Sequence, residues 1–166
     1  MAVTYEPIAT TTVSGGSTTT ITLSSIPQTY TDLVMVWTNL LGNNTGATFY
    51  FNGTTGTGYD YVYTFAQNAS VFTGEATNAG SINAVAGNLH EYNESWTNIF
   101  NYTSTSTNKS IISRFAGTGD ASGDWSTRDV RSWYQVGTWR STSAINSITL
   151  TSSSALSAGS TRLFLE

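Results

Sequence analysis

Residues 18–38, TTTITLSSIPQTYTDLVMVWT, hold two different β-strand patterns on either side of a proline. Before the proline, Ile21 and Leu23 alternate with threonines, which is the period-two pattern of a strand buried on one face. Pro27 has no amide hydrogen, so it interrupts the hydrogen-bond ladder. After it, residues 32–38 are almost all apolar, as in a strand buried on both faces. This stretch predicts a strand, a turn and a central strand of an all-β domain.

The rest of the chain continues this pattern, and no segment has a convincing helical period. Residues 59–65 place an aromatic side chain at every second position, and Asn52-Gly53 before them favours a tight turn because both residues tolerate positive φ. Residues 66–88 are small and polar, and we expect them to form the longest irregular stretch. Further strands are expected at residues 4–14, 48–52, 92–102, 109–116, 131–140, 145–151 and 161–165.

This spacing of strands and turns predicts an all-β protein, an antiparallel two-sheet β-sandwich with a jelly-roll-like arrangement. No linker divides the chain. We expect a single sandwich domain over residues 17–166, preceded by residues 1–16 as an extended N-terminal arm or first strand.

The composition excludes several classes of function. Charged residues make up only 10% of the chain, against about 25% in an ordinary soluble domain, so Ser, Thr and Asn must supply most of the polar surface. The formal net charge of −4 gives no attraction to nucleic acid or to an anionic membrane. No apolar run is long enough to span a bilayer. The chain has no cysteine, which excludes disulfides and thiolate chemistry, and its N-terminus lacks a secretion signal.

Two clusters could in principle bind a metal. His90, Glu91 and Glu94 have a spacing that suits a helix, but a strand would separate His90 and Glu94 by about 13 Å, so we expect a structural or surface histidine. Asp120 and Asp124 belong to a glycine-containing loop that resembles the start of a calcium loop but lacks the later bidentate carboxylate, so we expect a solvated turn, with a loosely held Ca²⁺ ion as the alternative. Serines are abundant, but no Gly-x-Ser-x-Gly motif is present. We predict no catalytic residue, no cofactor and no resident metal in a protein that is not an enzyme.

The aromatic residues are the best candidates for either core or binding. Trp96, Phe100 and Tyr102 would share one face of a strand, and we expect most aromatic side chains to form the sandwich core. A minority could be exposed and bind a partner. The candidates for such contacts are Tyr59, Tyr61, Trp125 and Trp139.

Four segments carry a family resemblance. They are residues 21–36 (ITLSSIPQTYTDLVMV), 51–61 (FNGTTGTGYDY), 99–112 (IFNYTSTSTNKSII) and 144–166 (AINSITLTSSSALSAGSTRLFLE). In this order they resemble the signature of small virion proteins of tailed bacteriophages. The resemblance implies a jelly-roll-like sandwich and a structural role in the virus particle, made in the host cytoplasm without secretion.

The resemblance leaves two placements open. In the first, the chain is a capsid decoration or cement protein that binds the major capsid protein as a homo-oligomer, which we expect to be a trimer. Tyr5, Ile8 and Val13 of its N-terminal arm are the candidate contacts. In the second, it is a tail or fibre module that recognises host surface glycans through exposed aromatics and residues 66–88. Neither placement involves nucleic acid or membrane insertion.

Overall fold

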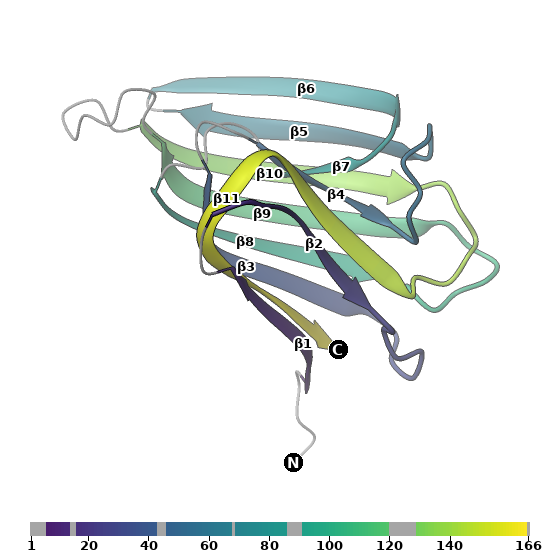
Figure 1. Ribbon diagram of the computed structural model, residues 1–166. Helices are drawn as coiled ribbons and strands as arrows, with labels where there is room; N and C mark the ends of the chain where they lie inside the picture. Colours follow the sequence, from purple (N-terminus) through teal and green to yellow (C-terminus); the bar gives the residue numbers. More distant parts are fainter. Residues whose placement is uncertain are drawn as a thin grey trace, which may run out of the picture.

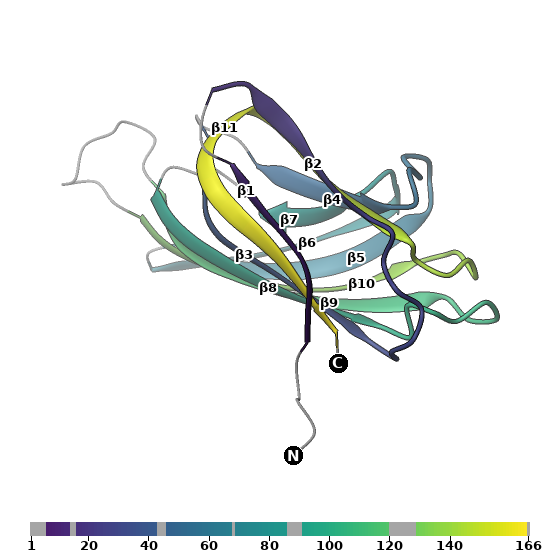
Figure 2. The same cartoon turned by 60° about the horizontal axis from the view of Figure 1, so that its bottom comes forward.

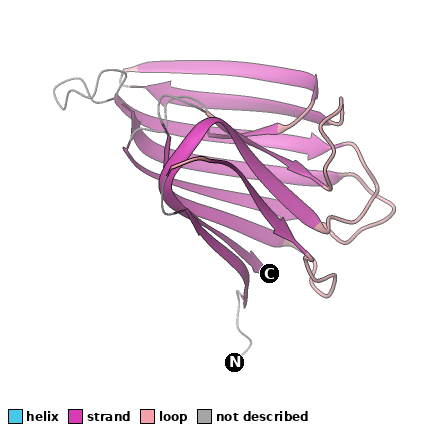
Figure 3. Ribbon diagram, in the orientation of Figure 1, coloured by secondary structure: helices cyan, strands magenta, loops and turns pink. Residues whose placement is uncertain are grey.

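The computed structural model describes residues 6–13, 16–42, 46–67, 69–85, 91–119 and 129–165. Every regular element in these ranges is a β-strand (Figure 3). The strands are β1 (Glu6–Val13), β2 (Thr18–Ser24), β3 (Leu33–Gly42), β4 (Ala47–Phe51), β5 (Tyr59–Gln67), β6 (Ser70–Ala79), β7 (Ile82–Val85), β8 (Glu91–Phe100), β9 (Lys109–Gly119), β10 (Asp129–Trp139) and β11 (Ser147–Leu165). The prediction of an all-β fold is confirmed.

The strands form two antiparallel layers that share the long strand β11. The larger layer has the order β6-β5-β10-β9-β8-β3, followed by the C-terminal half of β11 and then β1. The smaller layer contains β2, the N-terminal half of β11, β4 and β7. Figures 1 and 2 show β11 in yellow as a bent strand that passes from one layer to the other. The predicted two-sheet sandwich is therefore confirmed.

The hydrophobic core lies between the two layers and follows from the period-two pattern of the strands. In β4, Phe49 and Phe51 are fully buried, and each meets an aromatic side chain of the larger layer. The ring of Phe49 lies 6.2 Å from that of Trp37 in β3. The ring of Phe51 lies 5.4 Å from that of Trp139 in β10, with the two planes nearly perpendicular. Large rings from both layers thus fill the space between them.

The turn of residues 25–32 is fixed to the loop that precedes β11. The Ile26 amide donates a hydrogen bond to the Asn146 carbonyl over 3.1 Å. The Gln28 side-chain amide donates to the Ile145 carbonyl over 2.8 Å. The turn after β2 and the loop before β11 are therefore bonded to each other although they are far apart in the sequence.

The prediction for residues 66–88 was wrong over most of that segment. It contains β6 and β7, which pair with β5 and β4 respectively. Both strands lie at layer edges, and most β6 side chains are exposed. An edge strand needs few buried apolar residues, so its sequence resembles that of a polar loop.

The expected core face of β8 was also wrong. Asn93, Ser95 and Thr97 are buried on the inner face, and Ile99 follows them in phase, whereas Trp96 on the other face is only half-buried. The interior here is polar, which the aromatic spacing of the strand does not reveal. Tyr102 is fully buried, as expected, but it belongs to the turn after β8.

The N-terminal segment is part of the larger layer. Residues Glu6–Val13 form β1, which pairs with β11 of the same chain from Leu165 to Gly159. Val13 is buried in the core. To lie across a neighbouring capsid subunit, β1 would first have to leave its own sheet.

Candidate interaction surface

The large exposed hydrophobic side chains are concentrated on three adjacent strands at one end of the larger layer, β5, β6 and β10. In the described residues they are Val62, Val71, Phe72, Val130, Tyr134 and Val136. An antiparallel sheet that covers a core usually has polar side chains on its other face. This apolar concentration is therefore the strongest candidate for a binding surface.

The side chains of β5 and β10 alternate between an inner face, toward the smaller layer, and an outer face. Tyr59 and Trp139 point inward and are 0% and 2% exposed. Val62 and Val136 point outward and are 55% and 41% exposed. The two valines are direct cross-strand partners, so they form one continuous apolar area.

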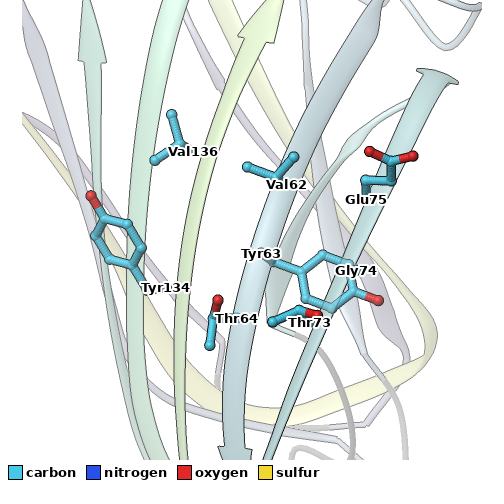
Figure 4. A pocket seen from close by; sticks show the side chains of 8 residues that line it. All are labelled: Val62, Tyr63, Thr64, Thr73, Gly74, Glu75, Tyr134 and Val136. Atoms are coloured by element: carbon cyan, nitrogen blue, oxygen red, sulfur yellow. The ribbon is translucent and has the colours of Figure 1, made fainter.

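The strand register builds a compact surface around these valines. In one row of cross-strand neighbours, Val62 lies between Glu75 of β6 and Val136 of β10. In the next row, Thr64 lies between Thr73 and Tyr134. Figure 4 shows these side chains around a shallow hollow of about 500 Å³. We call this set the outer patch; its side chains are those of Val62, Thr64, Thr73, Glu75, Tyr134 and Val136.

The outer patch combines apolar and polar side chains. Val62 and Val136 lie side by side in one row of it, and Tyr134, 48% exposed, supplies a ring with a hydroxyl group. Glu75 lies on the opposite side of the hollow and contributes a carboxylate (Figure 4). Exposed apolar and aromatic side chains beside polar groups are typical of protein interaction sites.

A second hollow, of about 310 Å³, continues the patch toward the start of β5 and includes Asp60. Its end is held by an ion pair in which Arg140 Nε lies 3.1 Å from Asp60 Oδ2. The other oxygen of Asp60 accepts the amide hydrogen of Asn78, a residue with a φ of 55°. These contacts fix an irregular pairing of β5 and β6 between Tyr59 and Tyr61.

The outer face continues across β9 and β8 as a row of larger side chains. Tyr134 is paired with Arg114, and Arg114 is paired with Trp96. Arg114 is exposed and Trp96 is half-buried. Glu94, Trp96, Arg114 and Ala116 line a further hollow of about 450 Å³. An arginine between two aromatic rings provides hydrogen-bond donors beside stacking surfaces.

The structure corrects two of the proposed contact residues. Tyr59 and Trp139 are stacked in the core with ring centroids 6.3 Å apart. The Tyr59 hydroxyl accepts the Phe51 amide hydrogen over 2.8 Å, and burial raises the pKa of Tyr59 to about 12. Period-two spacing identified the shared face but not whether that face was inside or outside.

The other proposed contacts have different positions. Tyr61 is half-buried on the inner face, where its ring lies 6.3 Å from that of Tyr63. Ile8 is partly buried and packs against the core, of which Val13 is a member. None of these three side chains belongs to the outer patch.

Several predicted features lie outside the described residues. They are Tyr5, Trp125, His90 and the loop from Asp120 to Asp124. In the ranges that the structure does describe, no three His, Cys, Asp or Glu side chains are grouped so that they could hold a metal ion.

The outer patch was not predicted, because the aromatic residues at every second position of β5 indicate the opposite face as the important one. The sequence nevertheless contains a signal, because a valine follows Gln135 and another precedes Tyr63 on the alternate face of each strand. Val62 and Val136 each occupy the face that an amphipathic strand would leave polar. A strand with large side chains on both faces indicates either a second layer or a partner.

In comparisons with known proteins, no protein-family model matches this chain, and no curated sequence matches it significantly. The described residues also include no helix with the length and hydropathy needed to cross a bilayer.

Proposed function

We propose that this chain is a non-enzymatic virion structural protein of a tailed bacteriophage. In this proposal it is a capsid decoration or cement protein that binds the outer shell as a homo-oligomer, with the outer patch as the contact surface. The observation that carries the binding role is the exposure of Val62, Val136 and Tyr134 on adjacent strands. The phage assignment rests on the four segments that resemble virion proteins.

The shape of the outer patch supports contact with another protein. Its hollows are shallow and extend along β5 and β10, so a complementary protein surface could cover them. Burying apolar area contributes about 25 cal/mol per Å², and the exposed valines supply this area without any change of the fold. Glu75, the one charged side chain of the patch, lies at its margin, where water can still reach it.

The number of copies in purified particles tests the placement. Quantitative mass spectrometry should find hundreds of copies of this chain when it is measured against the major capsid subunit. A few copies, or a small multiple of three or six, would contradict shell decoration and favour a position at the tail.

Variants of the patch test the contact itself. Val136→Lys places a charge beside the exposed Val62 and should lower rebinding to particles stripped of this protein. Thr20→Lys, on an exposed position of β2 in the other layer, is the control with the same added charge. Equal occupancy of the two variants would exclude the outer patch as the capsid contact.

A glycan-binding module of the tail is the second candidate function. The row Tyr134, Arg114 and Trp96 favours it, because aromatic rings and a guanidinium group are suited to stacking on sugars and to hydrogen bonding with their hydroxyls. Trp96→Ala should then reduce adsorption of phage to host cells while copy number stays low. Unchanged adsorption would leave this row without a role in host recognition.

A further inference from the structure

Strand β6 forms an open edge of the larger layer. In the described part of the chain it pairs with β5 and with no other strand. Figure 1 shows it as the outermost strand at one side of the molecule. Its outward backbone amides and carbonyls are therefore arranged to accept a further strand.

The sequence of β6, SVFTGEATNA, contains few of the features that usually prevent pairing at an edge. It has no proline and no lysine, and Glu75 is its only charged residue. Long edge strands are normally protected by such residues or by an irregularity. The irregularity present here lies near Asn78, at the end of the strand, so residues 70–75 remain regular.

The exposed side chains of β6 indicate how a partner would bind. Val71, 68% exposed, lies on the outer face opposite Ala66. Phe72, 46% exposed, lies on the inner face opposite Phe65, with ring centroids 4.6 Å apart. A partner docked on one face of the sheet would cover only one of them. A strand added in the plane of the sheet has side chains on both faces and can contact both.

We propose that β6 pairs in antiparallel orientation with β6 of a second copy of this chain. Such a partner must be an extended strand with apolar side chains on both faces, and β6 itself meets this requirement. A two-fold contact also uses the same surface from both copies, as symmetric dimers do. This contact would form the homo-oligomer of the proposed function. The inference rests on that function only for the expectation that the chain self-associates.

The geometry of the pair has a consequence for the outer patch. Opposite residues of antiparallel strands lie on the same face, so the two outer faces would lie on the same side of one continuous sheet. Thr73 and Glu75 connect the edge to the patch. The dimer would therefore present two outer patches side by side to a single partner surface.

The mass in solution, measured by light scattering after size-exclusion chromatography, tests the contact. The full chain should have twice the 17.8 kDa mass of one copy. Val71→Lys should weaken self-association at least tenfold and shift the mass toward one copy. Val130→Lys is a matched control, because Val130 is also a valine of 68% exposure but belongs to β10. It should remain a dimer.

Three outcomes would overturn the proposal. They are a wild-type monomer throughout the concentration range, a threefold mass, which would support a trimer instead, and equal effects of the two substitutions. Particle occupancy of the same proteins is a separate measurement. A wild-type monomer that still decorates particles would reject the β6 contact and the homo-oligomer, and would leave the proposed decoration of the shell intact.

Cysteine cross-linking locates the contact, since the chain has no cysteine of its own. In a two-fold antiparallel pair, only the residue on the axis faces itself, and its Cα atoms come within disulfide range. Single cysteines at each position from 71 to 75 should give one strong disulfide-linked dimer under mild oxidation. Thr105→Cys, in an exposed turn, is the control for random collisions. Yields no higher than this control at all five positions would reject β6 as the interface.

Discussion

The inner and outer faces of the larger layer differ in a way that ordinary strand alternation does not predict. Gln135 and Val136 are neighbours in β10, yet the glutamine is 0% exposed and the valine is 41% exposed. In the smaller layer, β2 follows the usual rule, with Ile21 and Leu23 buried and Thr22 between them exposed. Polarity is therefore reversed in one region of the sandwich and normal in the other.

Hydrogen bonds reduce the cost of burying polar side chains on this face, although Gln135 Oε1 has no hydrogen-bond partner among the described residues. Thr97, Ser113 and Gln135 form a row across β8, β9 and β10. The Thr97 hydroxyl donates to Ser113 Oγ over 3.0 Å, and the Gln135 side-chain amide donates to the carbonyl of Asn83, in β7 of the smaller layer, over 3.3 Å. Hydrogen bonds of this kind offset the loss of water.

No contact within the described residues offsets the exposure of the outer valines in the same way. Val62 and Val136 remain largely in water, although a polar residue at either position would suit a free surface. This contrast supports the proposed function, in which the inner face serves folding and the outer face serves binding. Substitutions on the two faces should separate these roles.

The largest expected effect is in the aromatic core. Trp139→Ala removes a ring that is 2% exposed and stacks on Tyr59, so it should lower the free energy of unfolding by about 3–5 kcal/mol. Tyr134→Ala, on the outer face of the same strand, should change it by no more than about 0.5 kcal/mol. Urea denaturation followed by tryptophan fluorescence measures both.

Similar losses for the two variants would contradict the distinction between the faces. A large loss for Tyr134→Ala in particular would mean that the outer face already stabilises the isolated chain. Far-ultraviolet circular dichroism of each variant is the control, because it shows whether the variant is folded before denaturation.

A pH-dependent effect should come from Tyr59. Burial raises its pKa to about 12 from an ordinary value near 10, so the unfolded chain loses this proton first. Stability from this group is therefore constant below pH 10 and falls between pH 10 and 12, by about 2 kcal/mol. Unfolding should be measured for wild type and Tyr59→Phe across this range.

The comparison with Tyr59→Phe isolates the group, because other titrating residues are common to both proteins. Burial also raises the pKa of Tyr102 and lowers that of Lys109, and these contributions cancel in the difference. The stability advantage of wild type over the variant should shrink above pH 10. A difference that stays constant to pH 12 would show that Tyr59 ionises as easily in the folded protein as in the unfolded chain.

An effect of intermediate size is expected in the polar row. Ser113→Ala leaves the buried Thr97 hydroxyl without this acceptor, which should cost about 1–3 kcal/mol. Combining it with Thr97→Val removes both polar groups, and the double variant should lose less stability than the sum of the two single changes. Thermal denaturation of the four proteins gives the coupling. Strict additivity would mean that the hydrogen bond contributes nothing beyond its separate groups.

The sequence predicted the regular parts of this fold because their cause is local. Alternation in Thr18–Ser24 and the apolar run in β3 follow from which faces those strands bury, and both strands were predicted within a few residues. The Asn52-Gly53 turn was also predicted, and both residues have positive φ. These features depend on neighbours in the chain.

The strand order and the site depend on contacts between distant residues. Nothing near Tyr59 in the sequence specifies that β5 pairs with β10. The two strands are far apart in the chain, as the pairing of Val62 with Val136 shows. The side chains of Ser95 and Thr97 point inward because the smaller layer covers that face, and Thr97 has Ser113 of the next strand, β9, beside it. The aromatic spacing of β8 therefore predicted the wrong face, and the outer patch was not predicted at all.

The smallest effect on stability, with a clear effect on binding, is expected at the outer valines. Val136→Thr keeps the shape and β-branching but adds a hydroxyl that water can solvate, so the free energy of unfolding should change by no more than about 0.5 kcal/mol. The same change at Val13, which is 6% exposed, should cost more than 1 kcal/mol, because the hydroxyl would be buried in the core. Occupancy of Val136→Thr on particles should fall severalfold, because a partner must then bury that hydroxyl. If Val136→Thr instead unfolds as easily as Val13→Thr and binds normally, the outer face contributes to folding, and the contrast between the two faces is wrong.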